Sequence, residues 1–227
     1  MIDFPGIENL TRKTASRILL VVVDGLGGYF DNATNKSELE DAHTPNLDNL
    51  AGESACGLSI PVDHGITPGS GPGHLSLFGY DPIKYQVGRG VLEAIGLGFE
   101  LNDNQIAIRG NFALTNAEGV ITDRRANRVS SKISSKLVKT LSNIMVPGFK
   151  THVELIRDHR FLLVLTSKNV APDYYPFVSD TDPGLNGLKP LPCEPTYPET
   201  IEIAGAINSF VVQTRKLLRD NQQANSI

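Results

Sequence analysis

The chain contains 227 residues, of which 40% are hydrophobic, and its formal net charge is −4. This length allows one large domain or two small ones with a buried core, whereas the acidic balance argues against nucleic acid as a partner. No apolar run approaches the roughly 20 residues that cross a bilayer, and the N-terminus has no apolar signal segment. The two cysteines lack metal-ligand spacing, so we expect a cytoplasmic protein without a membrane span.

The first predicted elements are a strand and a helix. Residues 17–25, RILLVVVDG, form an unbroken apolar run that is typical of a parallel strand buried on both faces, and Asp24 lies at its carboxyl end. In the HTPNLDNLAGES segment that follows, Thr44 can cap a helix and Pro45 fits its first position. The sequence therefore predicts a strand followed by a helix.

A second strand and helix follow, with Ser70 at the start of the helix. Residues 55–60, ACGLSI, form the strand, and the loop GITPGSGPG leads into a helix that begins near Pro72. A serine beside a helix start is commonly a cap, but ligand sites in open α/β sheets lie beyond the carboxyl ends of the strands, where Asp24 and Ser70 both fall. Helix cap and nucleophile both stay open for Ser70, and the β-α-β-α order predicts an α/β sheet.

From about residue 100 the pattern changes to that of a compact α+β unit. QIAIRGNFAL and GVITDRR, separated by a turn-like segment, predict an antiparallel pair over residues 105–114 and 119–125. Apolar residues at helical spacing predict a helix over residues 130–144. THVELI and RFLLVLT predict a second strand pair, 151–156 with 160–166, around a tight corner.

A proline-rich connection and a helix close the sequence. Residues 171–198 hold seven of the fourteen prolines, which predicts a long irregular connection rather than a core element. A polar tail ends the chain after an amphipathic helix. The apolar face of this helix consists of Ile203, Ile207, Phe210 and Leu217.

Seven motifs, read in order, resemble those of one enzyme family. They are VVVDGLGG, HTPNLDNLA, PGSGPGHLSLFGYDP, VGRGVLEAIGLG, IAIRGNFAL, ITDRRANR and SDTDP, and they extend from about residue 17 to about residue 190. Together they resemble the cofactor-independent (2,3-bisphosphoglycerate-independent) phosphoglycerate mutases of the archaeal type, within the alkaline phosphatase superfamily.

The resemblance implies an α/β fold, a partial alkaline-phosphatase-like α/β/α sheet with an inserted smaller α+β domain. The expected domain limits are 1–98 for the N-terminal part of the α/β domain, 99–170 for the inserted substrate-binding domain, 171–198 for the proline-rich connection, and 199–227 for a helix that returns to the α/β domain.

The resemblance also implies a reaction. It is the interconversion of 3-phosphoglycerate and 2-phosphoglycerate through a phosphoserine intermediate, without a requirement for 2,3-bisphosphoglycerate. Ser70 is then the nucleophile, and Asp24 and Ser70 are ligands in a site for two divalent metal ions. A serine hydroxyl needs a base or a metal to become nucleophilic, and paired divalent ions stabilise the attacking and leaving oxygens. Oxygen ligands favour Mn or Mg over Zn.

Arginines concentrate in the α+β unit, which holds six of the eleven. A single surface arginine is commonly solvated, but a ligand with a carboxylate and a phosphate favours the planar, bidentate donors of several arginines. Arg125 alternates with Arg124 along its strand and is expected to point away. By resemblance the substrate contacts are Arg109, Asn111, Asp123, Arg124 and Arg128, with His159, Arg160 and His74 as further candidates.

Two of these candidates have a second interpretation. His159 and Arg160 match a Gly-His-Arg corner of the family, in which Asp158 here replaces the glycine. His74 lies one helical turn after Ser70 and is either a site residue or a structural histidine.

Toward its end the sequence departs from the family pattern. In SDTDP, Ser179, Asp180 and Asp182 either border the site or form a turn, and Gly184 lies where relatives often carry histidine. The family's other metal ligands, several Asp and His residues, come from a later segment, whereas no histidine follows His159 here. We therefore expect the nucleophile and the substrate-binding unit without most of the metal ligands.

Such a chain needs completion by a missing C-terminal half, a second chain or a further copy of itself, because a parallel sheet with few strands leaves edges and faces uncovered. The expected ligands are 3-phosphoglycerate and 2-phosphoglycerate. Two other functions stay open: a metal-dependent phosphomonoester hydrolase of the same superfamily, and a non-catalytic fragment that binds a phospho-ligand. The product formed from 3-phosphoglycerate distinguishes these functions.

Overall fold

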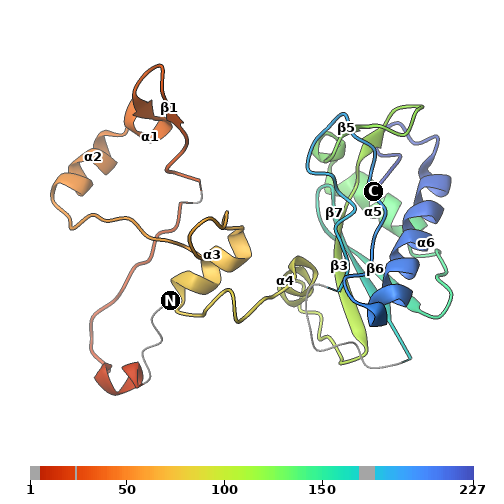
Figure 1. Ribbon diagram of the computed structural model, residues 1–227, viewed down its shortest axis with the longest axis horizontal. Helices are drawn as coiled ribbons and strands as arrows, with labels where there is room; N and C mark the ends of the chain where they lie inside the picture. The colour runs from red at the N-terminus through yellow and green to blue at the C-terminus, as the bar shows by residue number, and fades with distance from the viewer. Residues whose placement is uncertain (1–5, 24, 169–176) are drawn as a thin grey trace. The chain divides into compact units, whose positions relative to one another are not determined.

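The computed structural model describes residues 6–23, 25–168 and 177–227 (Figure 1). The chain divides into two compact units, Met1–Tyr85 and Gln86–Ile227, called here the N-terminal unit and the C-terminal unit. Within the described ranges, no helix combines the length and the apolar character that a membrane span requires.

The described part of the N-terminal unit consists of short helices and one small antiparallel ribbon. The predicted helix after Thr44 is present, with Thr44 at the N-cap position and Pro45 as its first residue. The helix predicted near Pro72 begins two residues earlier, at Ser70. The elements of this unit are η1 (Ile7–Leu10), β1 (Phe30–Asp31), β2 (Lys36–Ser37), α1 (Glu38–Asp41), α2 (Pro45–Gly52) and α3 (Ser70–Leu77).

The two strands predicted for this unit are wrong, since the described residues of 17–25 and 55–60 contain no strand. The side chains of Ile18 and Leu19 are 96% and 87% exposed. A strand buried on both faces needs hydrogen-bonded neighbours and covering helices, and in the described part of this unit the strands, β1 and β2, pair only with each other. The predicted parallel sheet is therefore replaced by a mixed α/β structure with small antiparallel sheets. Asp24 lies outside the described residues.

The C-terminal unit is built on a three-stranded antiparallel sheet with the order β3-β7-β6. Its central strand, β7 (Arg160–Thr166), carries five consecutive buried residues. It pairs with β6 (Lys150–Arg157), which confirms the strand pair predicted around the tight corner. Its other edge pairs with β3 (Gln105–Asn111), so β3 lies at the edge of the sheet.

The other predicted strand pair forms only in part. β4 (Leu114–Thr115) and β5 (Ile121–Asp123) form the expected hairpin, whereas β3 pairs along its whole length with β7. The turn is fixed by Asn116, whose Oδ1 accepts hydrogen bonds from the amides of Glu118 (3.1 Å) and Val120 (2.9 Å). The seven-residue β3 gains more hydrogen bonds and apolar contact from the buried β7 than the three-residue β5 can offer.

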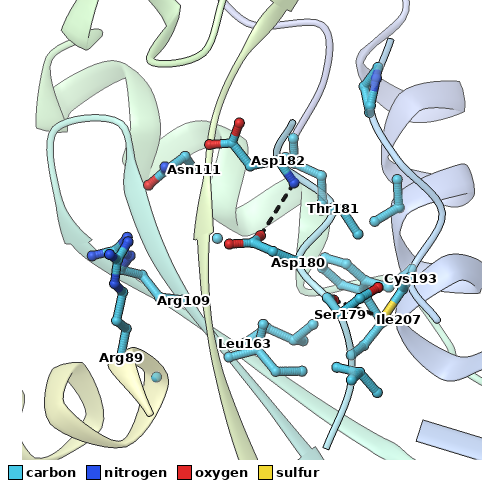
Figure 2. A pocket seen from close by; sticks show the side chains of 18 of the residues that line it. Arg89, Arg109, Asn111, Leu163, Ser179, Asp180, Thr181, Asp182, Cys193 and Ile207 are labelled. Atoms are coloured by element: carbon cyan, nitrogen blue, oxygen red, sulfur yellow. Dashed lines mark hydrogen bonds between the residues drawn. The ribbon is translucent and has the colours of Figure 1, made fainter. Parts of the chain in front are cut away.

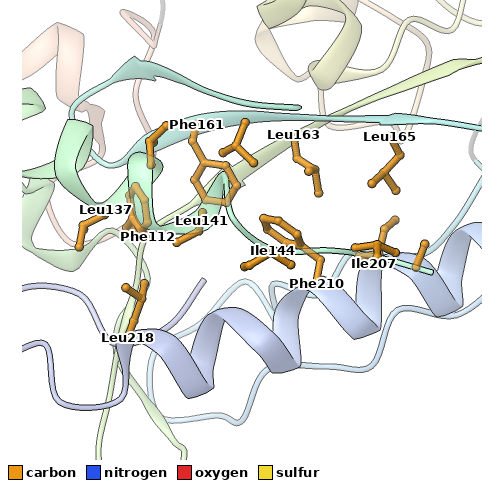
Figure 3. Close-up of a cluster of buried hydrophobic side chains, with 14 of the residues drawn as sticks. Phe112, Leu137, Leu141, Ile144, Phe161, Leu163, Leu165, Ile207, Phe210 and Leu218 are labelled. Atoms are coloured by element: carbon orange, nitrogen blue, oxygen red, sulfur yellow. The ribbon is translucent and has the colours of Figure 1, made fainter. Parts of the chain in front are cut away.

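Alternate side chains of β7 face opposite sides of the sheet. One side is the main core, which α5 (Ser131–Leu141) and α6 (Ile201–Leu218) cover, as Figure 3 shows. The other side packs against α4 (Arg89–Gly96). Phe161, Leu163 and Leu165 belong to the main core, whereas Leu162 and Val164 pack with Ala94 on the other side.

Three phenylalanine rings lie at the centre of the main core. The ring of Phe161 lies between those of Phe112 and Phe210, at centroid distances of 5.0 and 6.5 Å. Each fully buried ring contributes about 1.5–3 kcal/mol of apolar transfer free energy. A Cβ atom at Gly110 would overlap the Phe161 ring, so β3 accepts only glycine at this position.

The predicted amphipathic face of the closing helix is largely confirmed. Ile203, Ile207 and Phe210 are buried in the main core, but Leu217 is exposed and Leu218 is buried in its place. The one-residue shift keeps the apolar stripe on the sheet side of α6. The remaining short helices of this unit are η2 (Ala126–Arg128) and η3 (Pro198–Thr200).

The sequence places residues 199–227 with the α/β domain, whereas in the structure they pack inside the C-terminal unit. The polar tail is part of this packing, since Ser226 is fully buried. Asn225 Oδ1 accepts a hydrogen bond from the amide of Thr115 (2.7 Å), and its Nδ2 donates to the Thr115 carbonyl (2.8 Å). These bonds attach the tail to the end of β4.

Candidate functional site

A pocket of about 560 Å³ lies along β3 in the C-terminal unit (Figure 2). It is lined by β3, the first turn of α4 and residues 177–182, together with residues of β7 and α6. The volume is typical of sites for small molecules. The charged and amide side chains that line it are Arg89, Arg109, Asn111, Arg124, Asp180 and Asp182.

Positive charge exceeds negative charge around Arg109, which extends from β3. Nη1 of Arg109 and Nη1 of Arg160 lie 3.8 and 3.9 Å from the same oxygen, Oε1 of Glu93. Burial lowers the pKa of Arg109, and the nearby charges of Arg89 and Arg160 lower it further, against the opposing effect of Glu93 and Asp180. Such an excess of cations suits an anionic ligand.

Arg124 is held by a bidentate ion pair. Its Nε and Nη2 donate hydrogen bonds to Oδ1 and Oδ2 of Asp182, both at 2.7 Å. The hydrogen bond to Asp182 raises the pKa of Arg124, and the same bond lowers the pKa of Asp182. Two of the Arg124 donors that were predicted to bind a substrate are therefore used in this ion pair.

The SDTDP segment both forms a turn and lines the pocket. The amide of Asp182 donates to Asp180 Oδ1 (3.2 Å), the bond drawn dashed in Figure 2. The amide of Gly184 donates to Asp182 Oδ1 (2.9 Å), and Gly184 has a φ of 82°. This left-handed backbone favours glycine, which is a local reason for the residue at position 184.

Asn111 and Asp123 have different roles. Asn111 lines the pocket, and its buried Oδ1 has no hydrogen-bond partner among the described residues, an arrangement that costs about 1–3 kcal/mol unless a ligand or water donates to it. Asp123 lies outside the pocket lining and holds the turn after β5, because its two oxygens accept from the amides of Arg125 and Asn127, both at 2.7 Å. Arg125 and Arg128 are exposed, and neither lines the pocket.

The corner between β6 and β7 buries His159. Its side chain is 6% exposed, and its Nδ1 has no hydrogen-bond partner in the described part of the chain. Burial lowers the pKa of His159, and the charges of Arg160 and Arg125 lower it further, which favours the neutral ring at neutral pH. Asp158 has a φ of 51°, and its amide donates to Ser131 Oγ (2.9 Å). This hydrogen bond stabilises a non-glycine residue in a left-handed conformation.

Ser70 and His74 belong to the N-terminal unit. Gly69 occupies the N-cap position of α3, so Ser70 is the first helical residue rather than the cap. Nδ1 of His74 lies 2.6 Å from the Ser70 carbonyl oxygen. Because a carbonyl only accepts, Nδ1 carries the proton, which supports the structural interpretation of His74.

The described residues do not fit a two-metal site. Among them, no group of three or more His, Cys, Asp or Glu side chains could hold a metal ion. Oxygen-liganded divalent ions take six or more ligands each. Asp24, one of the two predicted ligands, lies outside the described residues.

Two residues near Arg109 were missed by the sequence analysis. Arg89 and Glu93 are four residues apart in α4, within the motif VGRGVLEAIGLG, and this spacing places them on one helix face. This spacing was the signal in the sequence that could have placed Arg89 and Glu93 together. Cys193 also lines the pocket, its thiol donates to the Ser179 carbonyl (3.6 Å), and burial raises its pKa to about 11. No sequence pattern indicated this position.

Comparisons with known proteins agree with one another. A family model described as 2,3-bisphosphoglycerate-independent phosphoglycerate mutase matches residues 51–224. A relative from Aquifex aeolicus named "Probable 2,3-bisphosphoglycerate-independent phosphoglycerate mutase" is 43% identical over 97% of this chain and 55% of its own length. A relative of the same name from Thermus thermophilus is 42% identical over 98% of this chain and 54% of its own length.

Two solved structures are also similar. The "Cofactor-Independent Phosphoglycerate Mutase from Thermoplasma acidophilum DSM 1728" has a TM-score of 0.51 and 37% identity, over 66% of this chain and 39% of that one. The PH0037 protein from Pyrococcus horikoshii has a TM-score of 0.56 and 25% identity, over 87% of this chain and 43% of that one. The chain spans about half the length of the curated relatives it matches.

Proposed function

Because the chain belongs to the 2,3-bisphosphoglycerate-independent phosphoglycerate mutases, we propose that it carries the nucleophile and the substrate-binding unit of an isomerase that interconverts 3-phosphoglycerate and 2-phosphoglycerate. The match of the family model over residues 51–224 carries this proposal, since it includes Ser70 and the charged residues of the pocket along β3. We assign the protein to the cytoplasm, where such metabolites occur.

The pocket along β3 is the proposed place of substrate binding. Phosphoglycerate carries a carboxylate and a phosphate, and arginine offers both groups a planar pair of donors. Arg109 and Asn111 line the pocket, and Arg160 lies opposite Asn111 in the β3–β7 register. In this proposal Arg124 reaches the substrate only when the substrate competes with Asp182 for its donors. Asp123, Arg128 and His159 then act by holding the surrounding turns.

The phosphoryl transfer is assigned to Ser70. Its Oγ attacks the phosphorus of 3-phosphoglycerate, the bond from phosphorus to O3 breaks, and the hydroxyl proton passes to O3. The glycerate turns without leaving, its O2 attacks the phosphoserine, the bond from phosphorus to Oγ breaks, and the 2-hydroxyl proton returns to Oγ. The position of Ser70 as the first residue of α3 supports this role, because the amides of a first helical turn and the helix dipole favour phosphoryl oxygens there.

We retain two divalent ions, Mn or Mg rather than Zn, as part of the proposal, with Asp24 and Ser70 among their ligands. The other ligands would come from the part of the relatives' length that this chain does not span. This chain would then be completed by a C-terminal half, a second chain or another copy of itself.

The experiment incubates the chain with Mn²⁺ and 3-phosphoglycerate, alone and mixed with a polypeptide that corresponds to the rest of the Aquifex aeolicus relative. We expect 2-phosphoglycerate in the mixture and a phosphate adduct on Ser70 by mass spectrometry. Ser70→Ala should abolish both, and Ser76→Ala, a second serine of α3, should abolish neither. Free phosphate in place of 2-phosphoglycerate would replace the proposal with a phosphomonoester hydrolase. Binding of 3-phosphoglycerate without either product would replace it with a non-catalytic binder.

A further inference from the structure

Helix α4 is fixed against the sheet by two small residues, Gly90 and Ala94. A Cβ atom at Gly90 would overlap the backbone carbonyl of Ala107 in β3, so the helix backbone touches the strand there. Ala94, one turn further, is fully buried against Leu162 and Val164 of β7. With these contacts the first turn of α4 cannot move along or away from β3 without losing packing.

The fixed helix places a second arginine beside Arg109. Arg89 is the first residue of α4, it lines the same pocket as Arg109, and its charge lowers the pKa of Arg109. Figure 2 shows the two guanidinium groups extending to the same side of the pocket, one from α4 and one from β3. Arg89 is exposed, so its position follows from the helix and not from burial of its own side chain.

The donors of this pair are open, unlike those of Arg124. Both Arg124 donors that face Asp182 make hydrogen bonds of 2.7 Å. Arg109 instead lies 3.8 Å from Glu93, which is too long for a hydrogen bond, and no side-chain hydrogen bond of Arg89 or Arg109 occurs among the described residues. Glu93 therefore offsets part of the positive charge of the arginines without occupying their planar hydrogen-bond donors.

We propose that Arg89 and Arg109 form a subsite for a dianionic phosphoryl group, in which Arg89 contacts the ligand directly. Arg89, Arg109 and Arg160 carry three positive charges, against which Glu93 and Asp180 carry two negative charges, so the cluster has one positive charge in excess. The two open guanidinium groups suit a phosphate monoester, which offers three acceptor oxygens, better than a carboxylate, which offers two. The inference rests on the proposed function for the identity of the phosphoryl group, which would be that of phosphoglycerate.

The test is isothermal titration of the chain with inorganic phosphate, glycerate and 3-phosphoglycerate. Inorganic phosphate should bind, and Arg89→Ala should weaken its binding about tenfold or more, since charge-assisted hydrogen bonds are lost. Arg89→Lys should restore part of the affinity, because the charge returns without the planar fork. Arg157→Ala removes another exposed arginine charge from the same unit and should leave the affinity unchanged.

The outcomes separate this inference from the proposed function. Phosphate affinity that is the same in Arg89→Ala and in the parent overturns the inference, whatever 3-phosphoglycerate does. If in that case 3-phosphoglycerate still binds, and Arg109→Ala abolishes that binding, the proposed function stands even though the Arg89 subsite does not. Phosphate binding that depends on Arg89, together with 3-phosphoglycerate that binds no more tightly than phosphate, supports the subsite and contradicts the proposed substrate. A parent chain that binds none of the three probes contradicts both. Circular dichroism of each variant reports whether the fold is retained.

Discussion

The apolar run RILLVVV at residues 17–23 and the apolar run RFLLVL at residues 160–165 are similar in composition and opposite in environment. Leu19 is 87% exposed, whereas Leu162 is fully buried. The second run is β7, which is paired on both edges and covered on both faces. The first run has no strand partner in the described part of the chain. The composition of an apolar run therefore indicates that it needs strand partners and covering helices. Whether it has them depends on other segments of the protein.

This difference agrees with the comparison of lengths. The described part of the C-terminal unit contains the strands that pair with β7 and the helices that cover it. The family model includes nearly all of this unit. The chain spans about half of its relatives, and we expect the partners of residues 17–23 in the other half. The four experiments below test this contrast between a run with partners and a run without them.

Hydrogen exchange has the largest expected effect. Amides of β7 should exchange only through unfolding of the C-terminal unit, with protection of at least about 1,000-fold, whereas described amides of residues 18–23 should exchange at nearly the rate of an unfolded chain. Mixing with the second half of a relative should protect the latter group. If both runs were equally protected in the chain alone, residues 18–23 would already have partners and the contrast would fail.

Two leucine substitutions compare the runs by stability. Leu162→Ala removes a fully buried side chain and should lower the free energy of unfolding by about 2–5 kcal/mol. Leu19→Ala removes an exposed one and should change it by no more than about 0.5 kcal/mol. Urea denaturation followed by circular dichroism measures both. A large loss in Leu19→Ala would contradict the exposure of the first run.

The same contrast explains how far the sequence predicts the fold. Features that depend on periodicity and on segments close in sequence were predicted. They are the strand pair around the β6–β7 corner, the helix over residues 130–144 and the apolar face of α6. The pairing of β3 with β7 joins strands about 50 residues apart, and local patterns favoured the nearer hairpin. The parallel strands failed because their burial requires segments that the described residues do not supply.

The candidate site follows the same rule. Arg109 and Asn111 were predicted from a motif, and both line the pocket. Their positions follow from strand alternation, which is local. Arg89 was missed because its approach to Arg109 depends on the packing of α4 through Gly90, a contact between distant elements. The bidentate pair of Arg124 with residue 182 was likewise invisible, since the two partners are 58 residues apart.

Two glycines of α4 extend the comparison to a smaller effect. Gly90→Ala places a methyl group against the carbonyl of Ala107 and should cost about 1–3 kcal/mol of stability. Gly96→Ala meets open space and should be neutral or stabilising by up to about 1 kcal/mol. The displaced helix in Gly90→Ala should also weaken phosphate binding, because Arg89 moves with it. Thermal unfolding and titration measure the two effects, and equal behaviour of the two variants would mean that α4 is not seated on β3.

The smallest effect concerns one ion pair in each unit. The hydrogen bond from Arg124 lowers the pKa of Asp182, so the ionised carboxylate stabilises the folded state. This contribution is complete above the unfolded pKa of about 3.9 and is lost as the pH falls through the lower folded-state pKa. Asp182→Asn should therefore cost about 1 kcal/mol at pH 7, a value that allows for partial solvent exposure, and nothing once the pH lies well below that folded-state pKa. Asp41→Asn breaks the exposed ion pair that Asp41 of the N-terminal unit makes with Lys36 at 3.5 Å, and it should have no measurable effect on stability.

Urea denaturation is the suitable measurement of both variants, because guanidinium would screen both ion pairs. If Asp182→Asn lowered the free energy of unfolding by the same amount at low pH, the shape of the side chain, rather than its charge, would stabilise this turn.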